Sequence, residues 1–192
     1  MAGSVYPQAR ALNRDARAGS RILYARRMIG PMLRGDATAV IPDVSQQEVF
    51  DFVIDPAQYR LADTKIVRVT KLGDRPDGMV AREDGTFMGR LPGTVVNGYR
   101  WDPPRRLDIT QEFGFPKSFH AWFEIDEANS GKATRIRHVE EIVIGKGPLG
   151  WLIEAIARRW WIRSVQQEVV EIRRLMGEGR RGRGLAAAGR MD

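Results

Sequence analysis

The feature that most constrains this chain is a run of six segments between residues 65 and 144 in which apolar and polar side chains alternate with a period of two. Turn-forming Gly, Pro, Asn and Asp residues separate these segments, and the connections are short. Short links between consecutive strands predict an antiparallel meander rather than a parallel sheet with crossover helices. The predicted strands cover residues 66–71, 79–87, 94–101, 106–115, 118–126 and 134–144.

Two short helices are predicted before the meander, after a first strand over residues 37–41. Ser45 stands three residues before Glu48, which is the spacing of a capping box, and a helix over 46–53 is expected to follow. Pro56 then starts a second short helical turn, because proline is favoured at the first position of a helix.

A long helix over residues 148–176 is predicted to end the fold, but its apolar face changes along its length. At about 100° per residue, the apolar side chains of its two halves lie on roughly opposite sides. Either the helix bends between residues 158 and 163 or its halves pack on different surfaces, and we expect a bend or a break. The two apolar sets are Leu149, Leu152, Ile153, Ile156 and Trp160, then Val165, Val169, Ile172 and Met176.

The formal charge of +7 belongs to the two ends of the chain. Residues 1–35 carry +6 and residues 177–192 carry +2, which leaves −1 on residues 36–176. We therefore expect a basic N-terminal arm that is partly helical or disordered, one folded domain, and a disordered Gly/Arg/Ala tail. The nearly neutral body argues against specific nucleic-acid binding, whereas the basic arm suits an anionic membrane surface.

The chain has no cysteine and two histidines, which removes several classes of site. A disulfide scaffold, a thiolate nucleophile and a Cys-ligated metal are excluded. No carboxylates cluster at metal-ligand spacing, so we expect no metal and no other cofactor. No apolar stretch approaches the ~18 residues of a membrane span, and arginines interrupt any signal sequence, so we expect a cytoplasmic protein. The 26 Arg against 5 Lys are typical of a high-GC, bacterial source.

Four local stretches resemble motifs of the SRPBCC superfamily, the polyketide cyclase/dehydrase-like and START/Bet v-like proteins. VSQQEVFDFVIDP at 44–56 is similar to the opening of these domains, and WDPPRRL at 101–107 is similar to one of their hairpins. GKATRI at 131–136 resembles the start of their last strand, and GPLG at 147–150 resembles the start of their final helix. The resemblance covers about residues 36–176.

This resemblance implies an α+β helix-grip fold. In it a curved antiparallel sheet of about seven strands, counting the N-terminal one, wraps around the long C-terminal helix, and two short helices follow the first strand. It also implies a cavity between the helix and the concave face of the sheet. If Ile125 and Ile136 point inward, as the corresponding family positions do, alternation orients their neighbours. Phe119, Ala121, Phe123, His138, Glu140, Leu107, Ile109, Gln111 and Phe113 then face inward, and His120 and Trp122 face outward.

His138 and Glu140 are the candidate catalytic pair, because two titratable side chains at i and i+2 share one strand face about 7 Å apart. The alternative is a structural His–Glu or Glu–Arg pair between strands at a sheet edge. Trp160 and Trp161 are candidates for a gate over the cavity mouth, with ordinary packing as the alternative. The candidate ligand-binding residues are Asn97, Tyr99, Gln111, Phe113, Phe119, Phe123, Ile136, Ile156 and Trp160.

Three functions stay open from the sequence. The first is binding of a small hydrophobic or lipid-like ligand in the cavity. The second is a polyketide cyclase or dehydratase activity, with His138 and Glu140 as acid and base. The third is a lipid or quinone carrier docked peripherally on an anionic membrane through residues 1–35. The oligomeric state cannot be inferred from the sequence.

Overall fold

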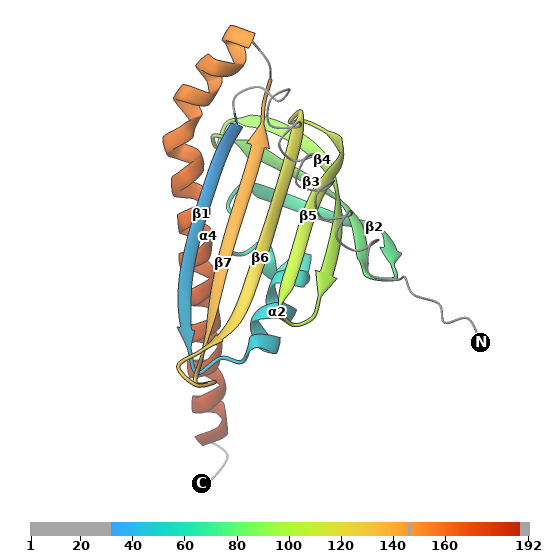
Figure 1. The fold of residues 1–192 in the computed structure, drawn as a ribbon. Coiled ribbons are helices and arrows are strands. Elements are labelled where there is room, and N and C mark those ends of the chain that lie inside the picture. Colours follow the sequence, from blue (N-terminus) through green and yellow to red (C-terminus); the bar gives the residue numbers. More distant parts are fainter. Residues whose placement is uncertain (1–31, 146, 189–192) are drawn as a thin grey trace, which may run out of the picture.

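The computed structural model describes residues 32–145 and 147–188 and shows a curved sheet with a long helix along one face (Figure 1). Seven strands and three helices follow one another in these residues. Their order is β1 (Met32–Pro42), α2 (Gln46–Ile54), α3 (Pro56–Tyr59), β2 (Ile66–Arg75), β3 (Gly78–Phe87), β4 (Leu91–Asp102), β5 (Arg106–Gly114), β6 (Ser118–Ala128), β7 (Ala133–Val143) and α4 (Gly147–Ala188).

All seven strands form one antiparallel sheet in the order β1-β7-β6-β5-β4-β3-β2. The six predicted meander strands are confirmed with small shifts at their ends. The first strand closes the order by pairing with the last strand of the meander. The predicted helix-grip architecture is therefore confirmed, because the sheet curves over α4 and the two short helices follow β1.

β1 is longer than the sequence pattern indicates, since it begins at Met32 rather than residue 37. Leu33 is only 1% exposed and packs against Ile142 and Trp161 in the core. Residues 32–35 were expected to belong to the partly helical or disordered basic arm. Pairing along the whole of β7 makes them part of the strand instead. The rest of the predicted arm lies outside the described residues.

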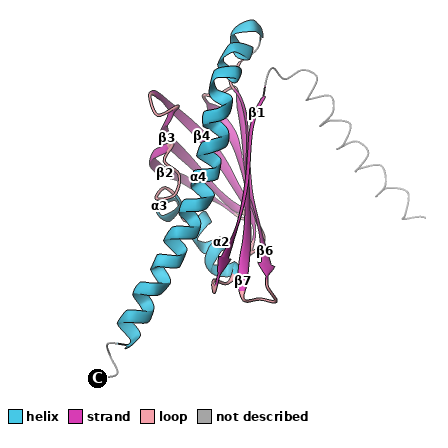
Figure 2. Ribbon diagram, turned by 90° about the vertical axis from the view of Figure 1, so that its left-hand side faces the viewer, coloured by secondary structure: helices cyan, strands magenta, loops and turns pink. Residues whose placement is uncertain are grey.

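The two short helices begin as predicted. Ser45 accepts a hydrogen bond from the backbone of Glu48, whose side chain in turn accepts one from the backbone of Ser45, so the capping box is present. Asp55 ends α2 and caps α3, with Pro56 at its first position. Both helices lie on the same face of the sheet as α4 (Figure 2).

α4 is one helix without interruption, so of the bend or break expected between residues 158 and 163 the break is wrong, and the helix instead curves in its first half (Figure 1). It also continues to Ala188, whereas the sequence predicted disorder from residue 177. No helix in the described part of the chain is both long enough and apolar enough to cross a membrane. The residues of α4 that are buried against the sheet form one continuous stripe, namely Gly150, Glu154, Ala157, Trp161, Ser164, Val165, Glu168, Val169 and Ile172.

The interior contains two hydrophobic clusters joined by a polar layer. The larger cluster lies beside α2 and includes Phe50, Phe123 and Ile172, and the smaller one includes Phe87 and Trp161. On β7 the inward residues pass from one cluster to the other as Ile136, His138, Glu140 and Ile142. The alternation of β7 thus places two titratable side chains between two apolar regions.

Candidate functional site

A pocket of about 110 Å³ lies between the sheet and α4 at the end that carries the smaller cluster. An engineered cavity of about 150 Å³ admits benzene, so this volume suits a single small ring or a short chain segment. Its apolar walls come from β3, the β5–β6 turn, β6, β7 and α4, and its opposite end is polar. The walls include Phe87, Phe115, Phe119, Ile142 and Trp161, and the polar end is made by Asp63, Lys65, Glu83 and Glu140.

Lys65 is the centre of the polar end. Its Nζ donates to both carboxylate oxygens of Glu140, at 3.0 and 3.1 Å, and to Oε2 of Glu168 at 2.8 Å. Asp63 Oδ1 lies 3.5 Å from the same nitrogen and accepts from the backbone N–H of Lys65 at 2.8 Å. The ammonium therefore bridges carboxylates from the turn before β2, from β7 and from α4.

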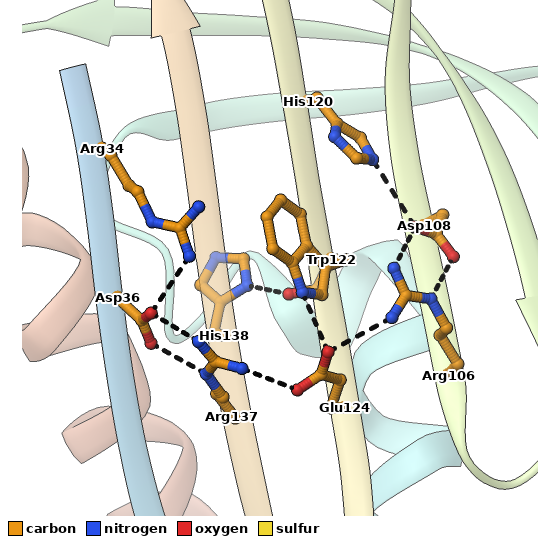
Figure 3. A network of polar contacts seen from close by, with 9 residues as sticks. All are labelled: Arg34, Asp36, Arg106, Asp108, His120, Trp122, Glu124, Arg137 and His138. Carbon is orange, nitrogen blue, oxygen red and sulfur yellow. Dashed lines mark hydrogen bonds and ion pairs between the residues drawn. The ribbon is translucent and has the colours of Figure 1, made fainter. Parts of the chain in front are cut away.

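His138 lies behind this cluster and is completely buried. Its Nε2 is 3.0 Å from Oε1 of Glu168 and 3.3 Å from Oε1 of Glu140. Its Nδ1 contacts the backbone carbonyl of Trp122 at 3.1 Å, as Figure 3 shows. The ring stacks on Phe123 with 3.9 Å between centroids. His138 is thus fixed on every side and does not border the pocket.

The charges of this cluster are set by neighbouring groups. Burial alone disfavours the charged form of Lys65, but Asp63, Glu140 and Glu168 outweigh it and raise its pKa well above the ordinary value. Burial also lowers the pKa of His138, yet Glu168 and Glu140 raise it overall to about 10. Burial raises the pKa of Glu168, but Lys65 and His138 hold it below the ordinary value. The interior therefore holds two cations and the carboxylate of Glu168.

Two further acids at the pocket have raised pKa values. Burial raises the pKa of Asp63, and the attraction of Lys65 offsets this only in part, so the value is about 8. Burial likewise raises the pKa of Glu83, against the hydrogen bonds of Tyr99 and Asn97. A protonated carboxyl can donate a hydrogen bond or a proton, so Asp63 offers a neutral donor beside an ammonium.

The opposite face of the sheet carries a separate network of ion pairs, shown in Figure 3. Arg137 bonds Asp36 on β1 and Glu124 on β6, and Arg106 bonds Glu124 and Asp108. These side chains are about a third exposed or more, so the pairs align the strands without contributing much to stability. The outward direction predicted for His120 and Trp122 fits this face, where their rings pack at a tilt with 4.9 Å between centroids.

The structure places the predicted site residues at different distances from the pocket. Glu140 and Phe119 line it. Tyr99 donates a hydrogen bond to Glu83 and reaches the pocket only through that group, and Asn97 is buried beside Glu83. Gln111 donates to the carbonyls of Gly114 and Pro116 and so holds the β5–β6 turn that supplies Phe115 to the wall. Phe123 and Ile136 are buried in the larger cluster.

Three orientations differ from those expected. Phe113 is 76% exposed, because the pairing of β4 with β5 slips by one residue between Gln111 and Phe113 and reverses its direction. Ile156 is 59% exposed, on the solvent side of α4. Trp161 lines the pocket, while Trp160 packs against Phe87 beside it.

The sequence reasoning missed Asp63, Lys65, Glu83 and Glu168. A signal for Glu168 was available, since it follows Val165 by three residues and precedes Ile172 by four on the apolar stripe of the helix. Asp63 and Lys65 lie in a turn, where no periodicity indicates direction.

Three residues of this buried cluster also have the arrangement of a possible metal site. One donor atom from each of His138, Glu140 and Glu168 lies within 4.8 Å of the others, which is spacing that can hold a metal ion. The Nζ of Lys65 already bonds both carboxylates and supplies a positive charge there. These residues therefore fit an internal ion-pair cluster better than a metal centre.

The sequence matches the family model described as polyketide cyclase / dehydrase and lipid transport over residues 32–177. The fold is similar to TTHA0849 from Thermus thermophilus, with a TM-score of 0.64, 14% identity and coverage of 75% of this chain and 95% of that one. The fold is also similar to that of the Zhui aromatase/cyclase from Streptomyces sp. R1128, with a TM-score of 0.59, 14% identity and coverage of 74% of this chain and 92% of that one. For a START superfamily protein from Mycobacterium smegmatis the TM-score is 0.54 and the identity 14%, with coverage of 72% of this chain and 98% of that one.

At such identities these structures establish the fold alone. Among curated proteins, none is similar enough in sequence to count as a match. The family model spans the sheet, the pocket and the buried part of α4, and the order of elements is that of the START-like helix-grip fold. The chain is a member of the polyketide cyclase / dehydrase and lipid transport family, within the SRPBCC superfamily.

Proposed function

We propose that this protein binds a small, mainly apolar ligand with one neutral oxygen-bearing end. The observation that carries the proposal is a pocket with aromatic walls and Lys65, Asp63 and Glu140 at one end. The walls suit a single ring, and the ammonium and protonated Asp63 suit a carbonyl, hydroxyl or phenol oxygen. A carboxylate ligand would meet Glu140 and Glu168 nearby, so a neutral polar group fits better.

Displacement of a hydrophobic dye by phenol, toluene and benzoate tests this proposal. Phenol should bind more tightly than toluene or benzoate. Phe119→Trp fills the pocket and should weaken phenol binding about tenfold, the effect of roughly 1.4 kcal/mol of steric cost. Phe113→Trp is the matched control, because Phe113 is exposed away from the pocket. Equal phenol affinity of the two variants would contradict the proposal.

A second function, acid–base catalysis of a ring closure, is favoured by two carboxyl groups on either side of Lys65. Asp63 holds a proton at neutral pH, and Glu140 also borders the pocket. In an aldol closure Glu140 takes a proton from a carbon between two carbonyls, and that carbon bonds to a third carbonyl carbon. Asp63 then protonates the resulting alkoxide, so that the product has the composition of the substrate. His138 positions Glu140 in this scheme and does not touch the substrate.

A short linear poly-β-ketone that closes one ring is the probe for this activity. Asp63→Asn should lower the rate of ring closure about 100-fold, the usual range for loss of a general acid, while leaving phenol binding nearly intact. Glu140→Gln should lower the rate similarly, because the amide cannot accept the proton from carbon. If both variants close the ring at the rate of the unchanged chain, the protein is a binder and not an enzyme of this kind.

A carrier of a lipid or quinone stays a further proposal. The pocket volume suits the ring of such a ligand rather than its chain. Docking through the basic arm stays a prediction, because residues 1–31 lie outside the described residues.

A further inference from the structure

The first part of α4 turns its most apolar side away from the sheet. Leu149, Trp151, Leu152 and Ile156 are 67%, 61%, 57% and 59% exposed, all within the first ten residues of the helix. Single exposed apolar residues are ordinary on a protein surface, but four neighbouring large ones mark an interaction site. We call these four residues the α4 ridge.

In this segment the side of the helix that faces the sheet is less apolar than the side that faces water. Toward the sheet the helix presents Gly150, Glu154 and Ala157, and the carboxylate of Glu154 is paired with Arg158. A turn of the helix about its axis would bury the ridge and expose Glu154 to water. The sequence thus keeps a strongly apolar face outside the fold.

Basic residues follow the ridge on the exposed side. Arg158, Arg159 and Arg163 are exposed, and Arg159 and Arg163 have no ion-pair partner within the described ranges. Glu154 is the one acid between residues 147 and 163, and it is buried. Leu and Trp side chains followed by arginines are typical of helices that lie in the interface of a membrane with anionic headgroups.

The position of the ridge makes it accessible to a flat surface. The first turns of α4 project beyond the end of the sheet (Figures 1 and 2). The β5–β6 turn is at the same end of the sheet, because Ser118 pairs with Val143. Phe115 in that turn is 48% exposed and belongs to the pocket wall. Trp161, five residues beyond Ile156 and on the buried side of the helix, lines the same pocket. The ridge therefore lies at the pocket's end of the molecule, on the side of α4 that faces away from the pocket.

We propose that the α4 ridge inserts into the interface of a bilayer with anionic headgroups, with Arg159 and Arg163 at headgroup level. A second copy of the chain is the less suitable occupant, because the exposed residues of this segment include no acid to pair with these arginines. The proposal does not depend on a ligand being in the pocket.

Co-sedimentation of the full chain with vesicles tests the proposal. Vesicles of phosphatidylcholine with phosphatidylserine should bind the protein, and vesicles of phosphatidylcholine alone should bind it much less. Changing Leu149, Leu152 and Ile156 together to Gln should abolish sedimentation with the anionic vesicles. Val67→Gln with Leu72→Gln is the matched control, because these residues are equally exposed on β2 and should not matter.

The arginines supply a second, independent variant. Arg159→Gln with Arg163→Gln should lower the partition coefficient about 30-fold in low salt, and high salt should remove the difference. Residues 1–31 add the same attraction to every variant, so they do not obscure these differences. Circular dichroism and thermal melting confirm that the variants fold.

Two results would overturn the proposal. One is sedimentation of the triple Gln variant equal to that of the unchanged chain. The other is a dimer in analytical ultracentrifugation that the triple Gln change dissociates, without any effect on vesicle binding. A blue shift of tryptophan emission on anionic vesicles that disappears in Trp151→Phe would place the ridge itself in the lipid.

Discussion

The two halves of α4 share one helix and one sheet, yet they use their apolar residues in opposite ways. The second half buries Val169 and Ile172 in the larger core and Val165 against Gly35 of β1. The first half buries Ala157 and Trp161 and leaves Ile156 in water with the rest of the ridge. An apolar stripe on a helix therefore indicates a contact surface, but it does not indicate whether that surface contacts the protein's own core or a partner. The second half holds the fold together, and the first half is available to a partner.

The largest effect on stability is expected at the ion-pair cluster of Lys65, Glu140 and Glu168, to which the second half of α4 contributes Glu168. Lys65→Met leaves Glu168 and Glu140 buried without their cation, and it should lower the free energy of unfolding by about 3–5 kcal/mol. Urea denaturation measures this loss. Lys71→Met, at an exposed lysine paired with Asp74, should change it by less than about 0.5 kcal/mol. A small effect at Lys65 would mean that the cluster is wetter than its burial indicates.

Substitutions of two isoleucines, one in each half of α4, compare directly how much the halves contribute to stability. Ile172→Ala opens a cavity in the larger core and should cost about 2–5 kcal/mol of stability. Ile156→Ala removes an exposed side chain and should cost less than about 0.5 kcal/mol. Thermal and urea unfolding of both variants check the difference. Similar losses would show that the ridge is covered within the folded chain.

The contact between β1 and α4 allows a third test. A Cβ on Gly35 would lie 2.5 Å from Cγ2 of Val165, so the helix can approach the strand this closely only at glycine. Gly35→Ala should therefore cost about 1–3 kcal/mol, and adding Val165→Ala should recover part of it. Gly73→Ala, which meets nothing within 4 Å, is the control in the same urea titration.

The last effect is a dependence of stability on pH, which is gradual because it is spread over several pH units. The raised pKa of His138 means that its contribution is present below about pH 6.5 and is lost as the pH rises toward about 10. Asp63, with a pKa of about 8 when folded, also makes stability fall as the pH rises from about 4 to about 8. Each contributes at most about 1.4 kcal/mol per pH unit. The lowered pKa of Glu168 acts in the opposite direction and costs stability below about pH 4.5.

Urea midpoints between pH 5 and 8 check this dependence. Asp63→Asn should flatten the decline, because the amide resembles the protonated acid and does not titrate. An unchanged slope in this variant would assign the decline to other groups.

Much of the fold was predictable from local sequence, because each strand carries its period of two and each turn its own residues. The capping box at Ser45 follows from the same local rules. The inward direction of His138 and Glu140 follows from alternation only after the family resemblance has set Ile136 inward. The direction of Phe113 was not predictable, since a single slip in pairing reverses it. Lys65 was missed because its place depends on a turn, and Trp160 was predicted to bind the ligand in place of Trp161 because the rotation of α4 decides between them.

By itself, the sequence determined the strands, the meander, the capped helices and the family, since alternation, turn residues and caps act over a few neighbours. Only the tertiary structure decided which face of α4 meets the sheet, how Lys65 joins Glu140 to Glu168, and that aromatic rings enclose a pocket beside them. These features arise from groups about a hundred residues apart, whose charges and shapes interact only after the chain has folded. A helix with two apolar faces can bury one of them, and packing against β1 at Gly35 selects it.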